Sequence, residues 1–172
     1  MTYQRFEDLP VWQEAIRLAE GCEDFLIAAK DRITYSKRDQ LDRCSLSVSN
    51  NIAEGFERGS TNELLAFLYI ARGSSGETRS MLCYFERRPA LRDFKSEISN
   101  LKSLAESCSR QIRAWADSLQ NSDIKGQRHL NDRTRNAAHQ KRAAEDFQRT
   151  SMSRLPADHP MRLEYERKHG PL

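Results

Sequence analysis

The sequence predicts an all-α protein, an up-down-up-down antiparallel four-helix bundle with a basic C-terminal extension. Three observations lead to this prediction. Apolar residues recur at alternating steps of four and three, the spacing that buries one stripe of a helix. The 172 residues include only 7 glycines and 5 prolines, too few for the many tight turns of a β-sandwich or barrel. Short connections near residues 31–36, 57–60 and 89–91 make successive helices antiparallel.

The first two expected helices each carry one apolar stripe. The first begins after Asp8, with Pro10 in its opening turn, where a missing N–H costs nothing. The second runs from about Lys37 to Phe56. The stripe residues are Val11, Ala15, Leu18, Cys22, Phe25 and Ala29 in the first helix, and Leu41, Cys44, Val48 and Ile52 in the second.

The third and fourth expected helices keep the same rhythm for longer. The third opens with a capping box, Ser60 with Glu63 three residues later, and ends before Pro89. Their stripes are Leu64, Leu68, Ala71, Ser75, Thr78, Leu82 and Phe85, and then Phe94, Ile98, Leu101, Ala105, Cys108, Ile112, Trp115 and Leu119. This sustained spacing favours left-handed packing at crossing angles of about 20°.

Charge divides the chain into two expected domains, a bundle over 1–122 and a tail over 123–172. Residues 1–124 hold 17 Lys and Arg against 19 Asp and Glu, whereas residues 125–172 hold 11 against 6 and all four histidines. The tail has few large apolar residues, so we expect it to be partly helical or extended. Its one expected helix, at about Asp132–Arg149, has only a thin apolar stripe.

Several classes of function are disfavoured by what the sequence lacks. It has no apolar run of 18 residues, and its first ten residues include the charged Arg5, Glu7 and Asp8, so we expect a cytoplasmic protein that does not enter a membrane. It has no phosphate-binding P-loop, no dinucleotide-binding glycine pattern and no Glu-x-x-His pair. We therefore expect no enzymatic activity, no catalytic residue, no cofactor and no small-molecule substrate.

The cysteines predict packing and not metal binding. Each expected helix carries one, and Cys22, Cys44 and Cys108 fall at similar heights in an antiparallel bundle. Small core thiols in a reducing compartment are the main interpretation. Three thiolates that bind a metal are the alternative, although a C-x-x-C pair is missing and the histidines lack a short metal-binding spacing.

Two runs of small residues mark the joint between the second and third helices. Residues 44–49 read CSLSVS and residues 71–76 read ARGSSG, and a turn near residue 59 would place them opposite each other. Gly73 and Gly76 each cost about 1 kcal/mol relative to alanine inside a helix. Close packing of the two helices is one compensation, and a surface open to a partner is the other.

Asn51 and Glu54 lie one turn apart near the edge of the second stripe. A partly buried carboxylate needs a charged hydrogen-bond partner, which Arg58 or Arg72 could supply. We interpret these residues as a structural network that fixes the helix register. A ligand or catalytic site and an interface between subunits are the alternatives.

Basic residues are the candidates for nucleic-acid binding. In the tail they are separated by few acidic residues, which suits phosphate contacts without base reading. These tail residues are Arg128, Arg133, Arg135, Lys141, Arg142 and Arg149. On the bundle, Arg72 and Arg79 lie seven residues apart on one face. The other candidates there are Arg87, Arg88 and Arg92 at the third connection, and Arg110 with Arg113.

Four stretches resemble a known family. They are Phe6-Glu7-Asp8-Leu9, Val11-Trp12-Gln13, Ser49-Asn50-Asn51-Ile52-Ala53-Glu54-Gly55, and Phe67-Leu68-Tyr69-Ile70-Ala71-Arg72-Gly73-Ser74 with Glu77. Over residues 5–120 the chain is similar to the bacterial four-helix-bundle family that includes the 23S rRNA intervening-sequence proteins and the accessory variability determinant of diversity-generating retroelements. Its motif residues here are Asn51, Glu54, Gly55, Arg72, Gly73 and Glu77.

The resemblance implies a homopentameric ring of bundles. In the retroelement branch it implies a basic ring that binds a reverse transcriptase and structured RNA. We therefore expect a non-enzymatic, oligomeric accessory protein for a reverse transcriptase and its RNA. The alternative is a structural homopentamer that binds another protein and has no role with RNA.

Overall fold

The computed structural model of the chain describes residues 3–121 and 132–171, without the side chains of 132–139, 141 and 142. These residues form helices joined by short connections and contain no strand, so the all-α prediction is confirmed. The chain divides into two compact units, 1–128 and 129–172. None of the helices in the described ranges is both long and apolar enough to cross a membrane.

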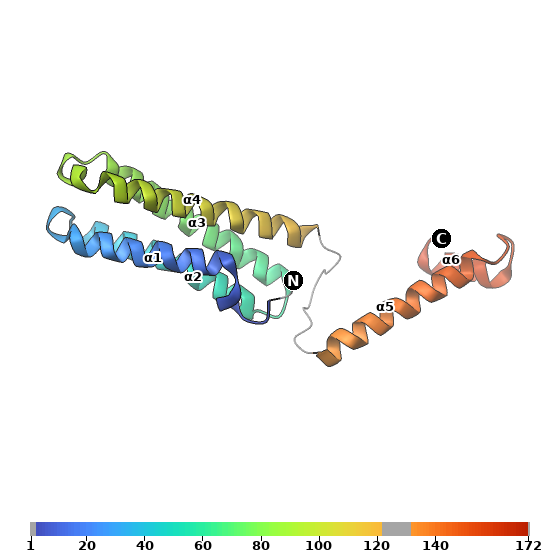
Figure 1. Cartoon of the computed structure of the whole chain (residues 1–172). Coiled ribbons are helices and arrows are strands. Elements are labelled where there is room, and N and C mark those ends of the chain that lie inside the picture. The colour runs from blue at the N-terminus through green and yellow to red at the C-terminus, as the bar shows by residue number, and fades with distance from the viewer. Residues whose placement is uncertain (1–2, 122–131, 172) are drawn as a thin grey trace. The chain divides into compact units, whose positions relative to one another are not determined.

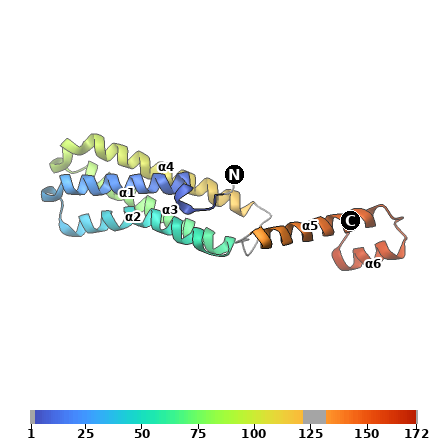
Figure 2. The same cartoon turned by 60° about the horizontal axis from the view of Figure 1, so that its bottom comes forward.

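Four long helices make up the first unit. They lie side by side in both views (Figures 1 and 2). Helix α1 packs against α2 and α4, and α3 packs against the same two helices. The helices are α1 (Pro10–Ala28), α2 (Tyr35–Glu57), α3 (Thr61–Glu86) and α4 (Lys95–Gln120), with short 3-10 turns η1 (Phe6–Asp8), η2 (Lys30–Arg32) and η3 (Pro89–Phe94).

The core of this unit follows the predicted stripes. Every stripe residue expected in the first three helices is buried. In α4 the prediction is correct from Ile98 to Ile112, but beyond that Ala116 is buried and Trp115 and Leu119 are only half-buried. The difference arises because a straight helix has 3.6 residues per turn, so a heptad pattern drifts around it over several turns.

Local signals explain where the helices begin and end. Pro10 is in the first turn of α1. Ser60 caps α3, because its Oγ accepts the Glu63 N–H at 3.3 Å and donates to the Glu63 carboxylate at 2.6 Å. Pro89 follows the end of α3 and opens the η3 turn, which continues through Phe94. Phe94 therefore precedes the fourth helix, although the sequence predicted it as the first residue of that helix's stripe.

The second unit contains α5 (Asp132–Ser153) and α6 (Pro160–His169). The expected tail helix is confirmed and runs one turn further than predicted. Helix α6 was not expected, although two local signals mark it. Pro160 lies in its first turn, and Gly170 ends it with a φ of +87°, a conformation that favours glycine.

Candidate nucleic-acid interface

The tail residues predicted to contact phosphate lie on α5 or just before it. Arg128 lies outside the described residues. Arg149 is on α5 and its side chain is exposed. Four others share α5 but have side chains that are not described: Arg133, Arg135, Lys141 and Arg142. The structure thus places most of this basic set on one helix.

Arg72 and Arg79 share α3 but have different surroundings. The Nη1 of Arg79 lies 3.9 Å from Glu106 Oε2 on α4, and Arg110 approaches the other oxygen of that carboxylate at 3.4 Å. Arg72 is half-buried, and among the described residues no carboxylate lies within ion-pair distance of it. The two arginines therefore do not form a matched pair of unneutralised cations.

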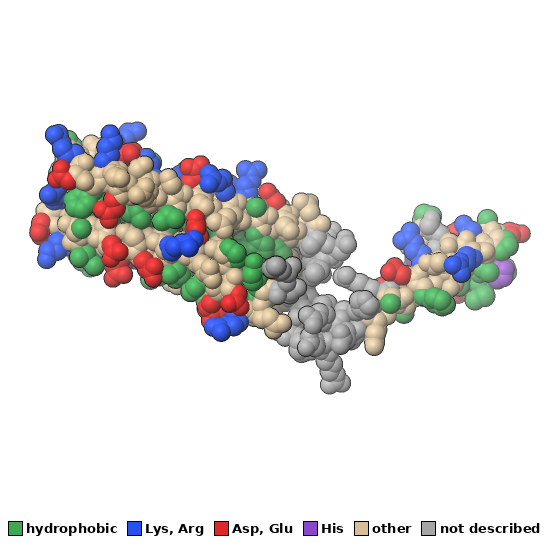
Figure 3. All heavy atoms as spheres, in the orientation of Figure 1, with side chains coloured by type: hydrophobic (Ala, Val, Ile, Leu, Met, Phe, Trp, Pro, Cys, Tyr) green, Lys and Arg blue, Asp and Glu red, His purple; other side chains and the backbone are tan. Residues whose placement is uncertain are grey.

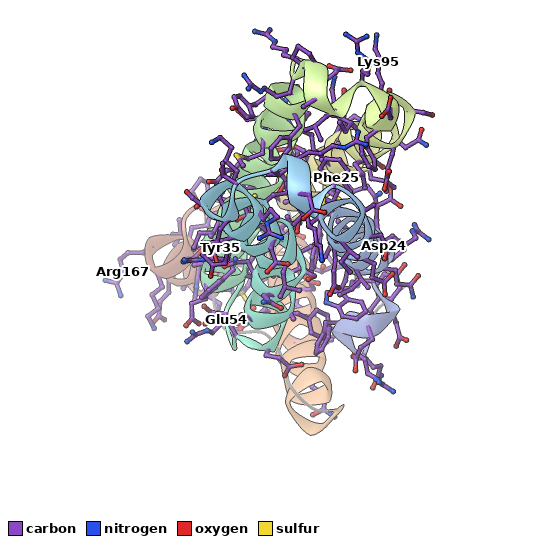
Figure 4. All side chains as sticks on the ribbon, turned by 90° about the vertical axis from the view of Figure 1, so that its left-hand side faces the viewer. Asp24, Phe25, Tyr35, Glu54, Lys95 and Arg167 are labelled. Carbon is purple, nitrogen blue, oxygen red and sulfur yellow. The ribbon has the colours of Figure 1, made fainter. Side chains whose placement is uncertain are left out.

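A denser basic surface lies at the end of the first unit where η2 leads into α2 and η3 leads into α4. Figure 3 shows Lys and Arg side chains gathered over the η3 end, and Figure 4 looks directly onto this end, with Lys95 and Tyr35 near its rim. Arg32 joins the two connections, because its Nη1 lies 2.9 Å from Asp93 Oδ2 and donates to the Ala90 carbonyl at 3.2 Å. Arg32 is thus already committed to an internal pair.

Tyr84, near the end of α3, lies beside two cations of this basic end. The Nζ of Lys37 on α2 and the Cζ of Arg88 are each 5.8 Å from the centre of its ring. Both distances allow a cation–π attraction. Arg88 was predicted from the sequence as a basic candidate, whereas Lys37 and Tyr84 were not. They come from different helices and lie far apart in the sequence, so no local pattern could have joined them.

The motif residues of α2 form a network that differs from the predicted one. The Nδ2 of Asn51 donates to the Ser47 carbonyl at 2.7 Å and to Ser47 Oγ at 2.9 Å, and Ser47 Oγ meets Ser74 Oγ of α3 at 3.0 Å. Asn51 therefore reaches α3 through Ser47. Glu54 is 52% exposed and pairs with Arg58 on its own helix at 2.5 Å. The expectation that Glu54 is partly buried is wrong, because its position on α2 faces solvent.

Gly55 of α2 lies close to α3, near the connection between the two helices. A Cβ at Gly55 would lie 2.7 Å from Phe67 Cβ and 3.2 Å from Leu64 Cδ1. Real Cβ atoms do not approach that closely, so only glycine fits there without a shift of the helices. The close contact between α2 and α3 that was expected at Gly73 and Gly76 is therefore found at Gly55.

Close packing does not explain Gly73 and Gly76. Both are exposed, and a Cβ at either would meet no atom within 4 Å. The close-packing expectation is wrong here, because these glycines lie on the solvent side of α3. Beside them a shallow hollow of about 440 Å³ lies between α2 and α3. Glu77 accepts a hydrogen bond from Gln40 at one end of this hollow.

The cysteines are reduced, and three of the four are buried. Burial raises the pKa of Cys22 and of Cys108 to about 12 and also raises the pKa of Cys44, so these thiols stay protonated at neutral pH. Within the described residues, no three His, Cys, Asp or Glu side chains group as metal ligands. The burial of Cys22, Cys44 and Cys108 agrees with the main interpretation, in which they are small core thiols.

The fold and these surfaces define a small helical protein with a glycine-containing open face and a basic end. A profile of the 23S rRNA-intervening sequence protein family matches residues 7–114, more than half of the chain. The chain therefore belongs to this family, whose name links its members to RNA. The comparisons found no matching curated protein and no matching solved structure. The matched range includes the α2–α3 joint and the basic end, and stops before the second unit.

Proposed function

We propose that this chain is a non-enzymatic RNA-binding protein built on an up-down-up-down four-helix bundle. Family membership over residues 7–114 is the observation that carries the proposal. The bundle topology is supported by the helix pairs in contact, which follow the chain from α1 to α4 and close between α4 and α1. Such a scaffold presents basic groups at fixed positions, as phosphate binding requires.

The charge distribution supports RNA as the ligand. Residues 125–172 hold 11 Lys and Arg against 6 Asp and Glu, and the first unit has its own basic end. Lys and Arg that neutralise phosphates release counterions, which gives affinity without base recognition. The resemblance described above supports a reverse transcriptase that works on structured RNA as the protein partner.

Self-assembly, with a homopentamer as the expected state, is the second part of the proposal. Residues 44–53 of α2 and 64–71 of α3 contain no charged side chain. Leu46 and Ile70 are about half exposed on these segments, and Gly73 leaves its surroundings open. We name this surface, Leu46, Asn50, Ile70 and Gly73, the uncharged face. Exposed apolar groups without charges are typical of contacts between subunits.

The same face favours the second candidate function, a structural homopentamer that binds another protein. In that case the hollow between α2 and α3 holds a partner segment, and the basic tail has no RNA to contact. RNA affinity and its salt dependence separate the two functions.

The test compares the full chain with a chain that ends after Ser122 for binding to a labelled structured RNA at several salt concentrations. The proposal expects the truncated protein to stay folded and oligomeric while its affinity and salt dependence fall strongly. A full-length variant with Arg133, Arg135, Lys141 and Arg142 changed to glutamine should behave likewise. A full chain that binds no RNA at low salt contradicts the proposal and favours the second candidate.

A further inference from the structure

Tyr84 presents an aromatic ring at the basic end of the first unit. Its side chain is 41% exposed, and its ring meets the buried Phe85 ring edge-on, with centroids 5.6 Å apart. A hollow of about 90 Å³ opens beside Tyr84, and the buried Ile33 and Leu91 are part of its lining. A half-exposed ring backed by buried side chains is a firm surface on which a flat group can stack.

Three cations line this hollow together with Tyr84, namely Arg32, Lys37 and Arg88. The lining includes no acidic residue. Asp93 neutralises Arg32 at 2.9 Å. Lys37 donates to Thr34 Oγ1 at 3.3 Å, and neither Lys37 nor Arg88 has a carboxylate within ion-pair distance in the described part of the chain. Two unneutralised cations beside an exposed ring suit an anion that also carries an aromatic group.

We propose that the Tyr84 site, formed by Tyr84, Lys37 and Arg88, binds an unpaired nucleotide of single-stranded RNA. The base stacks on Tyr84, and an adjoining phosphate lies between the two cations. This inference rests on the proposed RNA binding and adds the kind of RNA that the first unit recognises. The flexible stems of Lys37 and Arg88 let their charged groups move from the ring to the phosphate when a base arrives.

The geometry favours a single strand over a double helix. In a duplex the bases stack on one another and cannot reach a protein ring, whereas an unpaired base can be splayed out and stacked on tyrosine. The hollow of about 90 Å³ is small, so the base must lie on the exposed part of the ring while only a small group enters the hollow.

The test measures binding of the full chain to a labelled oligoadenylate and to a labelled RNA duplex of equal length by fluorescence anisotropy. Tyr84→Ala should weaken binding to the single strand about tenfold and leave duplex binding unchanged. Tyr84→Phe, which keeps the ring, should bind the single strand like the unaltered chain. Lys37→Gln with Arg88→Gln should lower the slope of log affinity against log salt by about 0.7, since the one phosphate that lies between these two cations is no longer neutralised.

Tyr69→Ala is the matched control, because Tyr69 is on the same helix and is 47% exposed, close to the 41% of Tyr84. The inference is overturned if Tyr84→Ala binds oligoadenylate as tightly as Tyr69→Ala does, or if it loses duplex binding equally. If circular dichroism shows that Tyr84→Ala does not fold, the Lys37→Gln, Arg88→Gln chain decides. An unchanged slope of log affinity against log salt in that chain overturns the inference. If the unaltered chain binds structured RNA but the Tyr84, Lys37 and Arg88 variants bind oligoadenylate as it does, only the Tyr84 site is refuted. If the unaltered chain binds no RNA, the proposed function is refuted as well.

Discussion

Gly55 and Glu54 are neighbours on α2 with opposite surroundings. A methyl group on Gly55 would meet Phe67 Cβ at 2.7 Å, whereas the Glu54 side chain is 52% exposed and pairs only with Arg58 in the described structure. Phe67 Cβ is attached directly to the backbone, so the clash cannot be relieved by rotating a side chain. A substitution at Gly55 therefore tests helix packing, whereas a substitution at Glu54 tests an exposed ion pair.

We predict that Gly55→Ala lowers the free energy of unfolding by about 1–3 kcal/mol, because overpacking forces α2 and α3 apart. Glu54→Ala should lower it by only about 0.3–0.5 kcal/mol, the usual value of an exposed pair one helical turn apart. Urea unfolding followed by circular dichroism measures both. Equal losses, or a larger loss for Glu54→Ala, would contradict this account of the motif.

The cysteines allow a second prediction at this scale. Burial raises the pKa of Cys22 and of Cys108 to about 12, so almost no thiolate forms there at pH 8 in the folded chain. Cys83 is the cysteine that is only half-buried. A thiol-alkylating reagent at pH 8 should therefore modify one thiol per folded chain, at Cys83, and all four in urea, as mass spectrometry would show.

The same shifts give a direction for stability against pH. The pKa of each buried thiol is higher in the folded chain than in the unfolded one. The thiols therefore contribute fully to the free energy of unfolding below the unfolded pKa of about 8.5, and this contribution is lost as the pH rises toward 12.

The control for the labelling experiment is Cys83→Ser, since that folded chain should take up no reagent. Two or more modified thiols in the folded, unaltered chain would show that the core opens readily.

At the scale of elements, most of the helical structure could be predicted because amphipathic periodicity is a local property of the sequence. The stripes of α1, α2 and α3 were correct at every residue, and the Ser60 cap and Pro89 marked ends that can be read locally. Helix α6 was not predicted because it has no buried residue and therefore no apolar stripe that its sequence could show. Its signals were the proline and glycine at its ends.

The candidate sites were harder to predict because they depend on which residues of different helices meet. Asn51 was identified, but its route to α3 through Ser47 and Ser74 requires the helix register. Tyr84 and Lys37 come together only after α2 and α3 have packed against each other. Small residues opposite one another suggested close contact at Gly73, whereas the contact is at Gly55, because rotation of the helix about its axis decides which glycine faces the neighbour.

Helix α3 gives the next prediction. Gly73 and Gly76 lie within the helix, and open space surrounds the Cβ position of each. Alanine has the higher helix propensity, and Gly76 is not part of the uncharged face, so Gly76→Ala should raise the free energy of unfolding by about 0.5–1 kcal/mol. Urea unfolding of this variant and of the unaltered chain checks this. Destabilisation by Gly76→Ala would contradict the open surroundings of this residue.

At the scale of the whole molecule, charge and apolar surface are separated. The uncharged face lies on α2 and α3, the basic end lies at η2 and η3, and the tail carries an excess of Lys and Arg. A protein that assembles through an uncharged face multiplies its basic surfaces without bringing like charges into the contact. Assembly would in this way raise the affinity for an RNA that can reach several copies at once.

The last prediction tests this assembly by light scattering at micromolar concentration. The chain should have a mass several times its own 19.9 kDa, since the uncharged face leaves apolar groups in water when the chain is alone. Ile70→Glu places a charge in the proposed contact, where an unpaired buried charge is costly, and should yield a folded protein of about 20 kDa. Ile27→Glu on α1 is the control, because Ile27 is 64% exposed, compared with 52% for Ile70, and is not part of the uncharged face. The Ile27→Glu chain should therefore assemble like the unaltered chain. An unaltered chain of 19.9 kDa, or an Ile70→Glu chain that stays assembled, would assign the uncharged face to a different partner.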